Sequence, residues 1–282
     1  MVAWWWLAGH TGAMTRRVSA PAVQARGVTV HRGSRPVLVN ASFTVPPGAV
    51  TAVIGPNGSG KSTLLYLLAG LLDPTTAGHL DVLGSPPGGD RARVALVLQS
   101  TEVSSRLPVT VRDVVAMGRF ARRSLLGWPA RRTRLADRRA VEVALERLEV
   151  ADLAGRQVDE LSGGQRQRVF VAQGLAQGAD LLLLDEPVTG LDVVSRHRIL
   201  EVVAEEAAAG TAVVMTTHDL AEAAAADHVL LLADGKVVDG APQEVLVPDV
   251  LRVAYGERLL VVGSGRVVVV DDPHHGHGHT HD

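Results

Sequence analysis

The sequence predicts an α/β fold built on a mostly parallel sheet, and three stretches carry this prediction. The apolar residues 50–54 precede a glycine-rich turn, after which leucines recur at helical spacing from Leu64 to Leu68. Leu181–Leu184 is an unbroken apolar run, which is typical of a parallel strand buried on both faces. A third apolar run, Thr211–Thr217, follows a segment with helical periodicity. Strands that alternate with helices in this way favour a parallel sheet.

Length and composition narrow the classes of protein without choosing a function. The 282 residues suffice for about two domains, or for one larger α/β domain with a subdomain. The 28 basic and 30 acidic residues leave a net charge of −2, so charge gives no case for a nucleic-acid partner, and we expect none. The absence of cysteine (Cys 0) excludes disulfides, iron–sulfur clusters and thiol catalysis, and it fits a reducing cytosol.

Residues 1–22 are interpreted as a disordered or spurious leader. The apolar patch Trp4–Leu7 is short and has no basic residue ahead of it, which argues against a signal peptide. Met14 is an alternative start to Met1, and the sequence does not choose between them. No run of 18 or more apolar residues occurs, so we expect no membrane-spanning helix and expect any membrane component to be another chain.

Short apolar alternation over residues 28–50 predicts an antiparallel ribbon that leads into the strand at 50–54. The alternation is interrupted by Arg32-Gly33 and by Pro46-Pro47-Gly48, which are turn signals. We therefore expect a β-rich lobe beside whatever the following glycine-rich turn binds.

The glycine-rich turn fits G-x-x-x-x-G-K-[ST] in full and predicts a nucleotide site. Backbone N–H groups in such a turn, with the positive end of the following helix, bind phosphate oxygens. Lys61 is expected to reach the β- and γ-phosphates, and the Ser62 hydroxyl is expected to bind Mg²⁺. ATPases, GTPases and kinases all carry this motif, so it does not name the reaction. The predicted binding residues of this phosphate loop are Gly55, Pro56, Asn57, Gly58, Ser59, Gly60, Lys61, Ser62 and Thr63.

An apolar strand over residues 93–98 ends at Gln99. Ligand crevices in open parallel sheets lie beyond the carboxyl ends of the strands, so Gln99 is a candidate ligand contact.

Residues 109–150 are predicted to be helical, with Thr110 as an N-cap, and they contain a basic cluster. One interpretation of this cluster is a solvated helical face. The other is a docking surface for another protein, with Trp128 as a further anchor. The members of the cluster are Arg119, Arg122, Arg123, Arg131, Arg132, Arg134, Arg138 and Arg139.

Ser162 and Gln165 match the S-x-x-Q capping box, so a helix is expected to begin here. The two glycines between them, Gly163 and Gly164, leave backbone N–H groups accessible at the helix start, which would make a second anion site. A capping box with a purely structural role is the alternative.

Two carboxylates, Asp185 and Glu186, directly follow Leu181–Leu184. We expect both to face a ligand or water, because charged side chains are rarely part of a core. Asp185 is expected to hold Mg²⁺ together with Ser62, and Glu186 to polarise an attacking water molecule.

A helix is expected from about Val193 to Ala209, with Asp192 as its N-cap and Gly210 as its stop. The strand Thr211–Thr217 then ends at His218, on the same edge of the sheet as the carboxylates. A lone histidine is usually structural, and only its position favours a role at the site. Residues 229–232 and 236–238 predict a closing hairpin.

Taken together, Gly55–Thr63, Gln99, Leu161–Gln165, Leu181–Glu186 and His218 resemble the ATP-binding cassette (ABC) family, in its order and at its usual spacings. The resemblance spans about Gly27 to Gly240. It implies a P-loop NTPase cassette: a RecA-like, mostly parallel sheet core, an antiparallel β lobe and a helical subdomain at about 101–165.

The resemblance also implies ATP and Mg²⁺ as cofactors and a head-to-tail dimer of two copies of the chain. Ser62, Gln99 and Asp185 would position Mg²⁺, Glu186 would activate water, and Lys61 and His218 would contact the γ-phosphate side of ATP. Ser162, Gly163, Gly164 and Gln165 would act on the nucleotide of the second copy. Where the family has an aromatic residue against adenine, this chain has Arg32, so base stacking comes from Arg32, from His31, or is weak.

Residues 106–119 resemble the metal-importer ATPases for zinc and manganese, in the subdomain that receives the permease. The resemblance thus implies a subunit at the cytoplasmic face of the membrane that powers uptake of zinc, or manganese, through a separate permease fed by an extracytoplasmic metal-binding protein. An ATPase for another solute and a metal-sensing regulatory protein are the alternatives.

We accordingly divide the chain into a leader (1–22), an ATPase domain (23–245), a C-terminal extension (246–272) and a histidine-rich tail (273–282). Histidines spaced by Gly and Thr cannot build a core but can wrap a metal ion such as Zn²⁺. A tail without consequence is the alternative. The candidate ligands are His274, His275, His277, His279 and His281.

Overall fold

The computed structural model describes residues 20–32, 35–72, 78–99, 109–120, 131–256, 259–262 and 266–269. The leader up to residue 19 and the histidine-rich tail lie outside the described residues, as do Trp128, Arg122 and Arg123 from the basic cluster. Within the described ranges, no helix has the length and apolar character needed to cross a membrane.

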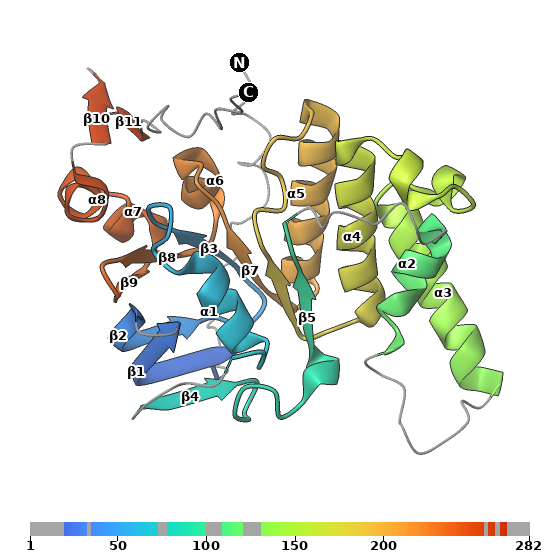
Figure 1. The fold of residues 1–282 in the computed structure, drawn as a ribbon, viewed down its shortest axis with the longest axis horizontal. Helices are drawn as coiled ribbons and strands as arrows, with labels where there is room; N and C mark the ends of the chain where they lie inside the picture. The colour runs from blue at the N-terminus through green and yellow to red at the C-terminus, as the bar shows by residue number, and fades with distance from the viewer. Residues whose placement is uncertain are drawn as a thin grey trace, which may run out of the picture.

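A six-stranded sheet forms the centre of the molecule, in the order β5-β6-β7-β3-β8-β9 (Figure 1). Its neighbours pair in parallel from β5 through β8, and only β9 is antiparallel, which confirms the predicted mostly parallel sheet and the closing hairpin. The strands are β3 (Val50–Ile54), β5 (Val94–Val97), β6 (Leu181–Leu184), β7 (Ala212–Thr216), β8 (His228–Ala233) and β9 (Lys236–Gly240).

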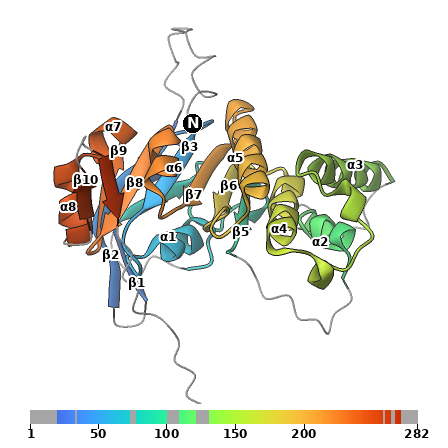
Figure 2. The same cartoon turned by 90° about the horizontal axis from the view of Figure 1, so that it is seen from above.

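Helices cover both faces of this sheet, so its strands are apolar on both sides. In β6, Leu181 and Leu183 pack in the cluster that contains α1, whereas Leu182 and Leu184 pack in the cluster that contains α4 and α5. Figure 2 shows α1 on one side of the sheet and α5 and α6 on the other. The helices are α1 (Lys61–Leu68), α4 (Gly163–Gln177), α5 (Val193–Ala208) and α6 (Leu220–Ala225).

The predicted antiparallel ribbon is present and gains a third strand. β1 (Val23–Arg32) pairs with β2 (Arg35–Val45) on one side and with β4 (His79–Val82) on the other. This sheet shares its core with α1, and Val37, near the tip of the β1–β2 hairpin, packs against Gly60 at the start of that helix. Arg32 lies at that tip, opposite Arg35 in the register.

The helical part lies at the opposite end of the molecule from the antiparallel sheet (Figure 1). It contains α2 (Val111–Met117) and α3 (Arg131–Arg147), followed by the short 3-10 turns η3 (Ala151–Leu153) and η4 (Val158–Glu160). The predicted N-cap Thr110 is confirmed: its hydroxyl accepts the N–H of Asp113 at 3.2 Å, and Asp113 accepts the N–H of Thr110 at 3.2 Å.

Arg119 and Gln177 attach α4 to its surroundings. Arg119 donates to the carbonyls of Ala176 (2.8 Å) and Gln177 (3.1 Å) at the end of α4, and it pairs with Asp137 of α3 at 2.8 Å. The Gln177 amide donates to the carbonyls of Arg91 in the 3-10 turn η1 (Arg91–Arg93) at 3.1 Å, and of Val94 at the start of β5 at 2.8 Å.

Arg119 therefore belongs neither to a solvated face nor to a docking surface, the two interpretations of the basic cluster, because its side chain is only 12% exposed. Arg138 and Arg139 are exposed on α3. The side chains of Arg131, Arg132 and Arg134 lie outside the described part of the chain.

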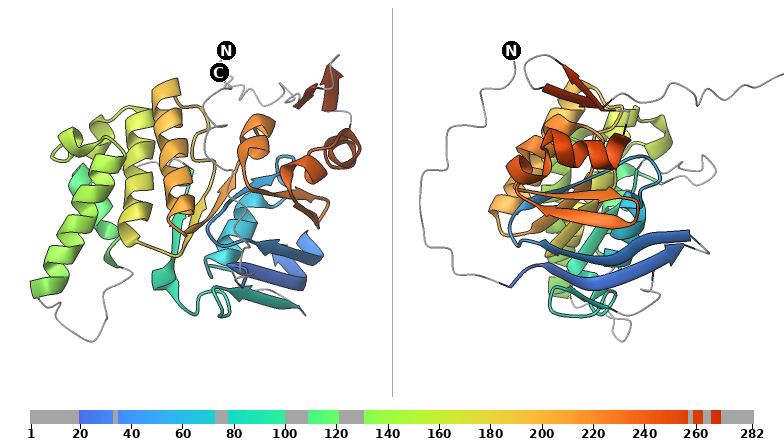
Figure 3. Two further views of the ribbon diagram at one scale, coloured as in Figure 1. Left: turned by 180° about the vertical axis from the view of Figure 1, so that it is seen from behind. Right: turned by 90° about the vertical axis from the view of Figure 1, so that its left-hand side faces the viewer.

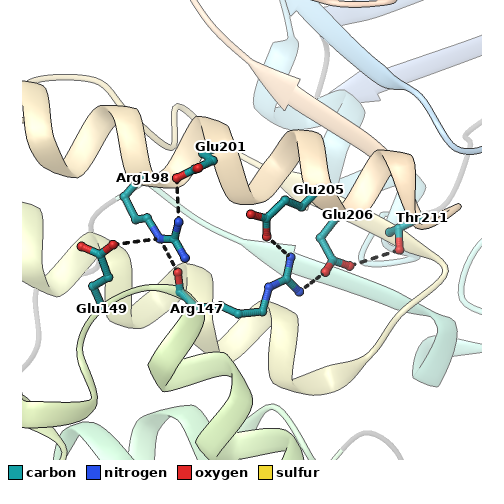
Figure 4. A network of polar contacts seen from close by, with 7 residues as sticks. All are labelled: Arg147, Glu149, Arg198, Glu201, Glu205, Glu206 and Thr211. Carbon is teal, nitrogen blue, oxygen red and sulfur yellow. Dashed lines mark hydrogen bonds and ion pairs between the residues drawn. The ribbon is translucent and has the colours of Figure 1, made fainter. Parts of the chain in front are cut away.

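A network of charged groups joins α3 to α5 (Figure 4). Arg147, the last residue of α3, pairs with Glu206 and, at 2.9 Å, with Glu205 of α5. Burial lowers the pKa of Arg147, but the hydrogen bonds to the two glutamates outweigh it and raise the pKa above its ordinary value. Arg198 of α5 reaches back to the carbonyl of Arg147 and pairs with Glu201 at 2.6 Å.

The C-terminal segment lies beside β8 and β9, away from α2 and α3 (Figure 3). It consists of α7 (Pro242–Val245), α8 (Pro248–Tyr255) and a two-stranded antiparallel sheet of β10 (Leu259–Val262) and β11 (Arg266–Val269). Leu251 and Tyr255 of α8 share an apolar cluster with Ile54 of β3, so this helix packs against the central sheet.

Candidate functional site

The phosphate loop lies between β3 and α1 with backbone angles that only glycine adopts easily. Gly60 immediately precedes α1 at φ 105°, and a Cβ there would lie 2.2 Å from Val37 Cγ1. At Gly55, with φ 149°, a Cβ would lie 2.1 Å from the carbonyl oxygen of Leu232. The conformation of this loop therefore requires its glycines.

Lys61 is buried at the first position of α1. Its ammonium group donates to the carbonyls of Gly55 at 2.8 Å and Pro56 at 3.3 Å. The positive charge is thus held against the loop backbone, at the N-terminus of a helix, where anions are favoured.

An open pocket of about 790 Å³ lies over this loop. The β1–β2 hairpin forms one wall with Arg32, Pro36 and Val37, and the turn Ala233–Gly235 forms another. Glu186 contributes from the end of β6. The loop itself contributes every residue from Pro56 to Thr63, so the structure brings Arg32, the loop and Glu186 together as the sequence predicts.

The two carboxylates after β6 have different environments. Asp185 is only 6% exposed, and one of its oxygens accepts a hydrogen bond from the Thr216 hydroxyl at 2.7 Å. Glu186 is the one that lines the pocket. Its backbone has a φ of 45°, which is unusual for a residue with a side chain.

Gln99 and His218 both approach Glu186. The Gln99 amide donates to Glu186 Oε2 at 3.0 Å, and His218 Nδ1 lies 3.9 Å from the same oxygen. The ends of β5, β6 and β7 therefore meet at one edge of the sheet, as expected from their parallel arrangement.

Thr216 is a site residue that the sequence patterns did not reveal. Its hydroxyl donates to Asp185 and accepts the N–H of Glu186, each at 2.7 Å, and its side chain is fully buried. The only available signal was a polar residue at the end of the apolar run Thr211–Thr217. That signal gains meaning only once β7 is known to lie beside β6.

A model of the ABC transporter family matches residues 38–189, which is more than half of the chain. The chain belongs to the ABC transporter family. Its ABC cassette binds ATP and hydrolyses it for transport.

Several relatives are similar over nearly their whole length. The zinc transport system ATP-binding protein of Treponema pallidum is 39% identical over 242 residues, or 86% of this chain and 89% of that protein. The manganese transport system ATP-binding protein of Bacillus subtilis is 38% identical over 238 residues, or 84% and 93%. The hemin import ATP-binding protein of Streptomyces coelicolor is 42% identical over 260 residues, or 89% of each.

A solved ABC transporter in an inward-facing conformation, described as of the metal-chelate type, is similar in structure. It superposes with a TM-score of 0.73 at 27% identity and covers 89% of this chain and 98% of its own.

The ABC cassette offers oxygen donors suited to Mg²⁺, the metal its family implies. The Ser62 hydroxyl lines the pocket, and Asp185 keeps one carboxylate oxygen outside its bond to Thr216. The Gln99 NH₂ group donates a hydrogen bond to Glu186, which leaves the amide oxygen available as a metal ligand. Hydroxyl, carboxylate and amide oxygens are the ligands that hard cations prefer, so this donor set fits.

The signature segment of the cassette, Leu161–Gln165, begins α4 with the predicted capping box. The Ser162 hydroxyl accepts the N–H of Gln165 at 3.3 Å, and the Gln165 side chain accepts the N–H of Ser162 at 3.1 Å. Among the described residues that line the ATP pocket, none comes from this segment. The structure of one chain thus does not bring Ser162–Gln165 to its own phosphate loop.

A polar network lies beside His218 and joins α5 to the residues that follow this histidine in the chain. Arg196 of α5 lies 2.8 Å from Asp219 and 2.9 Å from Glu222. Burial raises the pKa of Asp219, but the hydrogen bonds from Arg196 and a backbone N–H outweigh it, and the pKa lies below its ordinary value. Burial raises the pKa of Glu222 above its ordinary value, although hydrogen bonding to Thr217 and the charge of Arg196 act against this.

Proposed function

We propose that this ATPase powers the uptake of a divalent metal ion, zinc or manganese, through a separate membrane permease. The observation that carries the proposal is the similarity, over more than four-fifths of the chain, to proteins named for zinc and manganese transport systems. The likeness to a solved transporter of the metal-chelate type supports it. We place the subunit at the cytoplasmic face of the membrane, held by the permease, with an extracytoplasmic metal-binding protein as an indirect partner.

The roles that we assign at the ATP site come from the resemblance to the ABC family, and the geometry described above supports them. Lys61 and the N–H groups of the phosphate loop bind the β- and γ-phosphates. Ser62, Gln99 and Asp185 hold Mg²⁺, which neutralises phosphate charge when bound. Glu186 orients and activates the attacking water, and His218 contacts the γ-phosphate.

We also assign the residues that contact the adenine base and those that complete the phosphate site. Arg32 lies in the pocket wall, where its planar guanidinium group can stack on adenine. We assign Ser162–Gln165 to the nucleotide of a second copy of the chain. Their absence from the pocket of their own chain supports this assignment.

Transport assays test the substrate. In a strain that lacks this gene, we expect the wild-type chain to restore accumulation of labelled zinc or manganese, and Glu186→Gln to restore neither. A relative named for hemin import is equally similar, so hemin, cobalamin and iron belong in the same assay. Restoration of hemin or cobalamin uptake alone would overturn the metal assignment.

A metal-sensing regulatory protein is the alternative of a different class. We propose that the tail histidines, which lie outside the described residues, bind Zn²⁺ and adjust the ATPase to metal supply. Deletion of residues 273–282 is expected to change the metal dependence of ATP turnover. The regulatory alternative is favoured over transport by two results together. Deletion of the gene leaves metal uptake unchanged, and the tail still controls the metal dependence of ATP turnover.

A further inference from the structure

His218 stands between two residues that a buried polar network holds in place. The Thr217 hydroxyl donates to Glu222 Oε2 at 2.5 Å and accepts the N–H of Asp219 at 3.0 Å. Thr217 is 3% exposed and Glu222 is 8% exposed. This network therefore holds the backbone on both sides of His218, and with it the point from which the imidazole projects.

Arg196 connects this network to α5. Its Nη2 group lies 2.8 Å from Asp219 Oδ2 and 2.9 Å from Glu222 Oε1. A guanidinium group presents its N–H donors in a rigid, planar arrangement, so one arginine can hold two carboxylates at a set separation. Without it, the two carboxylates repel each other, and the buried charge of Glu222 loses its counter-ion.

The same turn of α5 lies against the start of α4. The Arg196 N–H donates to the carbonyl of Asp192 at 3.0 Å, and Asp192 in turn caps the N–H of Ser195 at 2.9 Å. A Cβ placed on Gly164 would lie 2.5 Å from Asp192 Oδ2 and 2.5 Å from Ser195 Oγ. The first turns of α4 and α5 are thus in such close contact that one cannot shift toward the other.

We propose that Arg196 is a positioning residue for His218, and that it links the signature segment of a chain to the histidine in the ATP site of the same chain. The proposal rests on the roles assigned above to His218 and to Ser162–Gln165. The signature segment contacts the nucleotide of the second copy, and Gly164 within it packs against the first turn of α5. Arg196 transmits the position of that turn to Asp219. Each nucleotide then influences the histidine beside the other one.

The test is ATP turnover by the full 282-residue chain with Mg²⁺ and ATP, at a protein concentration that permits dimers. Arg196→Gln is expected to lower kcat by about tenfold or more, because the segment that carries His218 is no longer held in place. ATP affinity, measured by equilibrium binding, is expected to stay within about twofold, since the phosphate loop is untouched. The Hill coefficient for ATP is expected to fall toward 1. Arg196→Lys keeps the charge but not the planar donor set, so partial recovery of kcat is expected.

Arg198→Gln is the matched control, since it makes the same substitution on the same helix. Arg198 bonds to the Arg147 carbonyl and to Glu201 and pairs with Glu149 at 3.5 Å, and none of these belongs to the network of Arg196, Asp219 and Glu222. It is expected to lower stability while leaving kcat within about twofold of wild type. Equal losses of kcat in Arg196→Gln and Arg198→Gln would mean a general loosening of α5 and would overturn the proposal.

His218→Ala separates the possible failures. If it lowers kcat and the double variant with Arg196→Gln is no slower, the two residues act as one unit, as proposed. If His218→Ala is slow but Arg196→Gln turns over at the wild-type rate, the positioning role is wrong. If His218→Ala itself turns over normally, both the role of His218 and the proposal fall. Metal uptake is measured separately, so failure of the zinc or manganese assignment leaves these results unaffected.

Discussion

At the scale of single residues, Thr216 uses one hydroxyl group to bond both the Asp185 carboxylate and the Glu186 backbone N–H. A hydroxyl has one proton to donate and can also accept, and Thr216 does both toward Asp185 and the Glu186 N–H. Glu186 adopts a φ of 45°, and holding a residue with a side chain there costs roughly 1–3 kcal/mol. The bond to Thr216 is one of the contacts that keep this backbone in place.

Replacing Thr216 is therefore expected to slow ATP hydrolysis through its effect on Asp185 and Glu186 rather than through a contact with ATP. Thr216→Val keeps the shape and removes both hydrogen bonds, so we expect kcat to fall by about 10–100-fold and the Mg²⁺ concentration needed for half-maximal turnover to rise. Thr216→Ser keeps the hydroxyl and is expected to retain most activity. Steady-state turnover over a Mg²⁺ titration measures both effects.

Thr51 offers the control for this prediction. It lies in β3 and is also fully buried, but within the described part of the chain its hydroxyl has no hydrogen-bond partner. Thr51→Val makes the same change and is expected to leave turnover unaltered and stability equal or higher. A wild-type Mg²⁺ dependence in Thr216→Val would show that the shared hydroxyl does not position the carboxylates.

Capping residues could be predicted from the sequence, whereas Thr216 and Arg196 could not. A cap depends on residues within a few positions of it, as in Ser162 with Gln165 or Asp192 with Ser195. The role of Thr216 depends on the pairing of β6 with β7, which sets Leu184 opposite Met215. Sheet order arises from the packing of the whole chain, so no local pattern in the sequence contains it.

At the scale of elements, the first turns of α4 and α5 pack so closely that a methyl group on Gly164 would not fit between them. The space that a Cβ of Gly164 would need is filled by Asp192 and Ser195, and Ser195 is buried. At the neighbouring Gly163, by contrast, a Cβ would meet nothing within 4 Å. The two glycines of the signature segment thus differ in what they require, although the sequence presents them as a pair.

Gly164→Ala is accordingly expected to destabilise the fold by about 1–3 kcal/mol, because an added methyl forces the two helix starts apart. Gly163→Ala, its control, is expected to be neutral or to stabilise α4 by up to about 1 kcal/mol, because alanine favours the helix. Urea unfolding without nucleotide compares the two variants and excludes any effect of ligand contacts. Equal stabilities would contradict the close packing of α4 and α5.

The elements themselves were predictable because their apolar periods are regular, but their attachments were not. The leucine run of β6 and the helix over Val193–Ala208 match the expected limits within a residue. The basic cluster was ambiguous, since an arginine on a helix can face water, a partner or another helix. Only the structure shows that Arg119 faces the end of α4.

At the scale of the whole molecule, the phosphate loop and the signature segment of one chain lie apart. Its pocket contains the phosphate loop and Glu186, while its signature segment lies elsewhere. Val193 and Val194, beside that segment at the start of α5, are 82% and 67% exposed. Apolar exposure next to an incomplete site is consistent with a surface that a second copy covers.

Trapping the ATP-bound state tests this arrangement. Glu186→Gln keeps the phosphate loop but lacks the carboxylate to which we assign the activation of water, so we expect ATP to bind, turnover to fall by about 100-fold or more, and dimers to accumulate. Size-exclusion chromatography with light scattering, with and without Mg²⁺ and ATP, measures the dimer.

The double variant Glu186→Gln with Lys61→Ala is the control, and it is expected to stay monomeric because ATP binding is lost. In the wild type, turnover per molecule should rise with protein concentration. A monomer that hydrolyses ATP at the full rate at high dilution would contradict a site shared between two copies.

The hydrogen bonds made by Gln177 and Arg119 affect how the helical part unfolds and is degraded. The helical part projects from the sheet in Figure 2, yet α4 is bonded through Gln177 to the start of β5 and through Arg119, which follows α2, to α3. We therefore expect local opening of these helices to require that the bonds to β5 break as well. The described helices of this part are accordingly expected to resist proteolysis for as long as the core does.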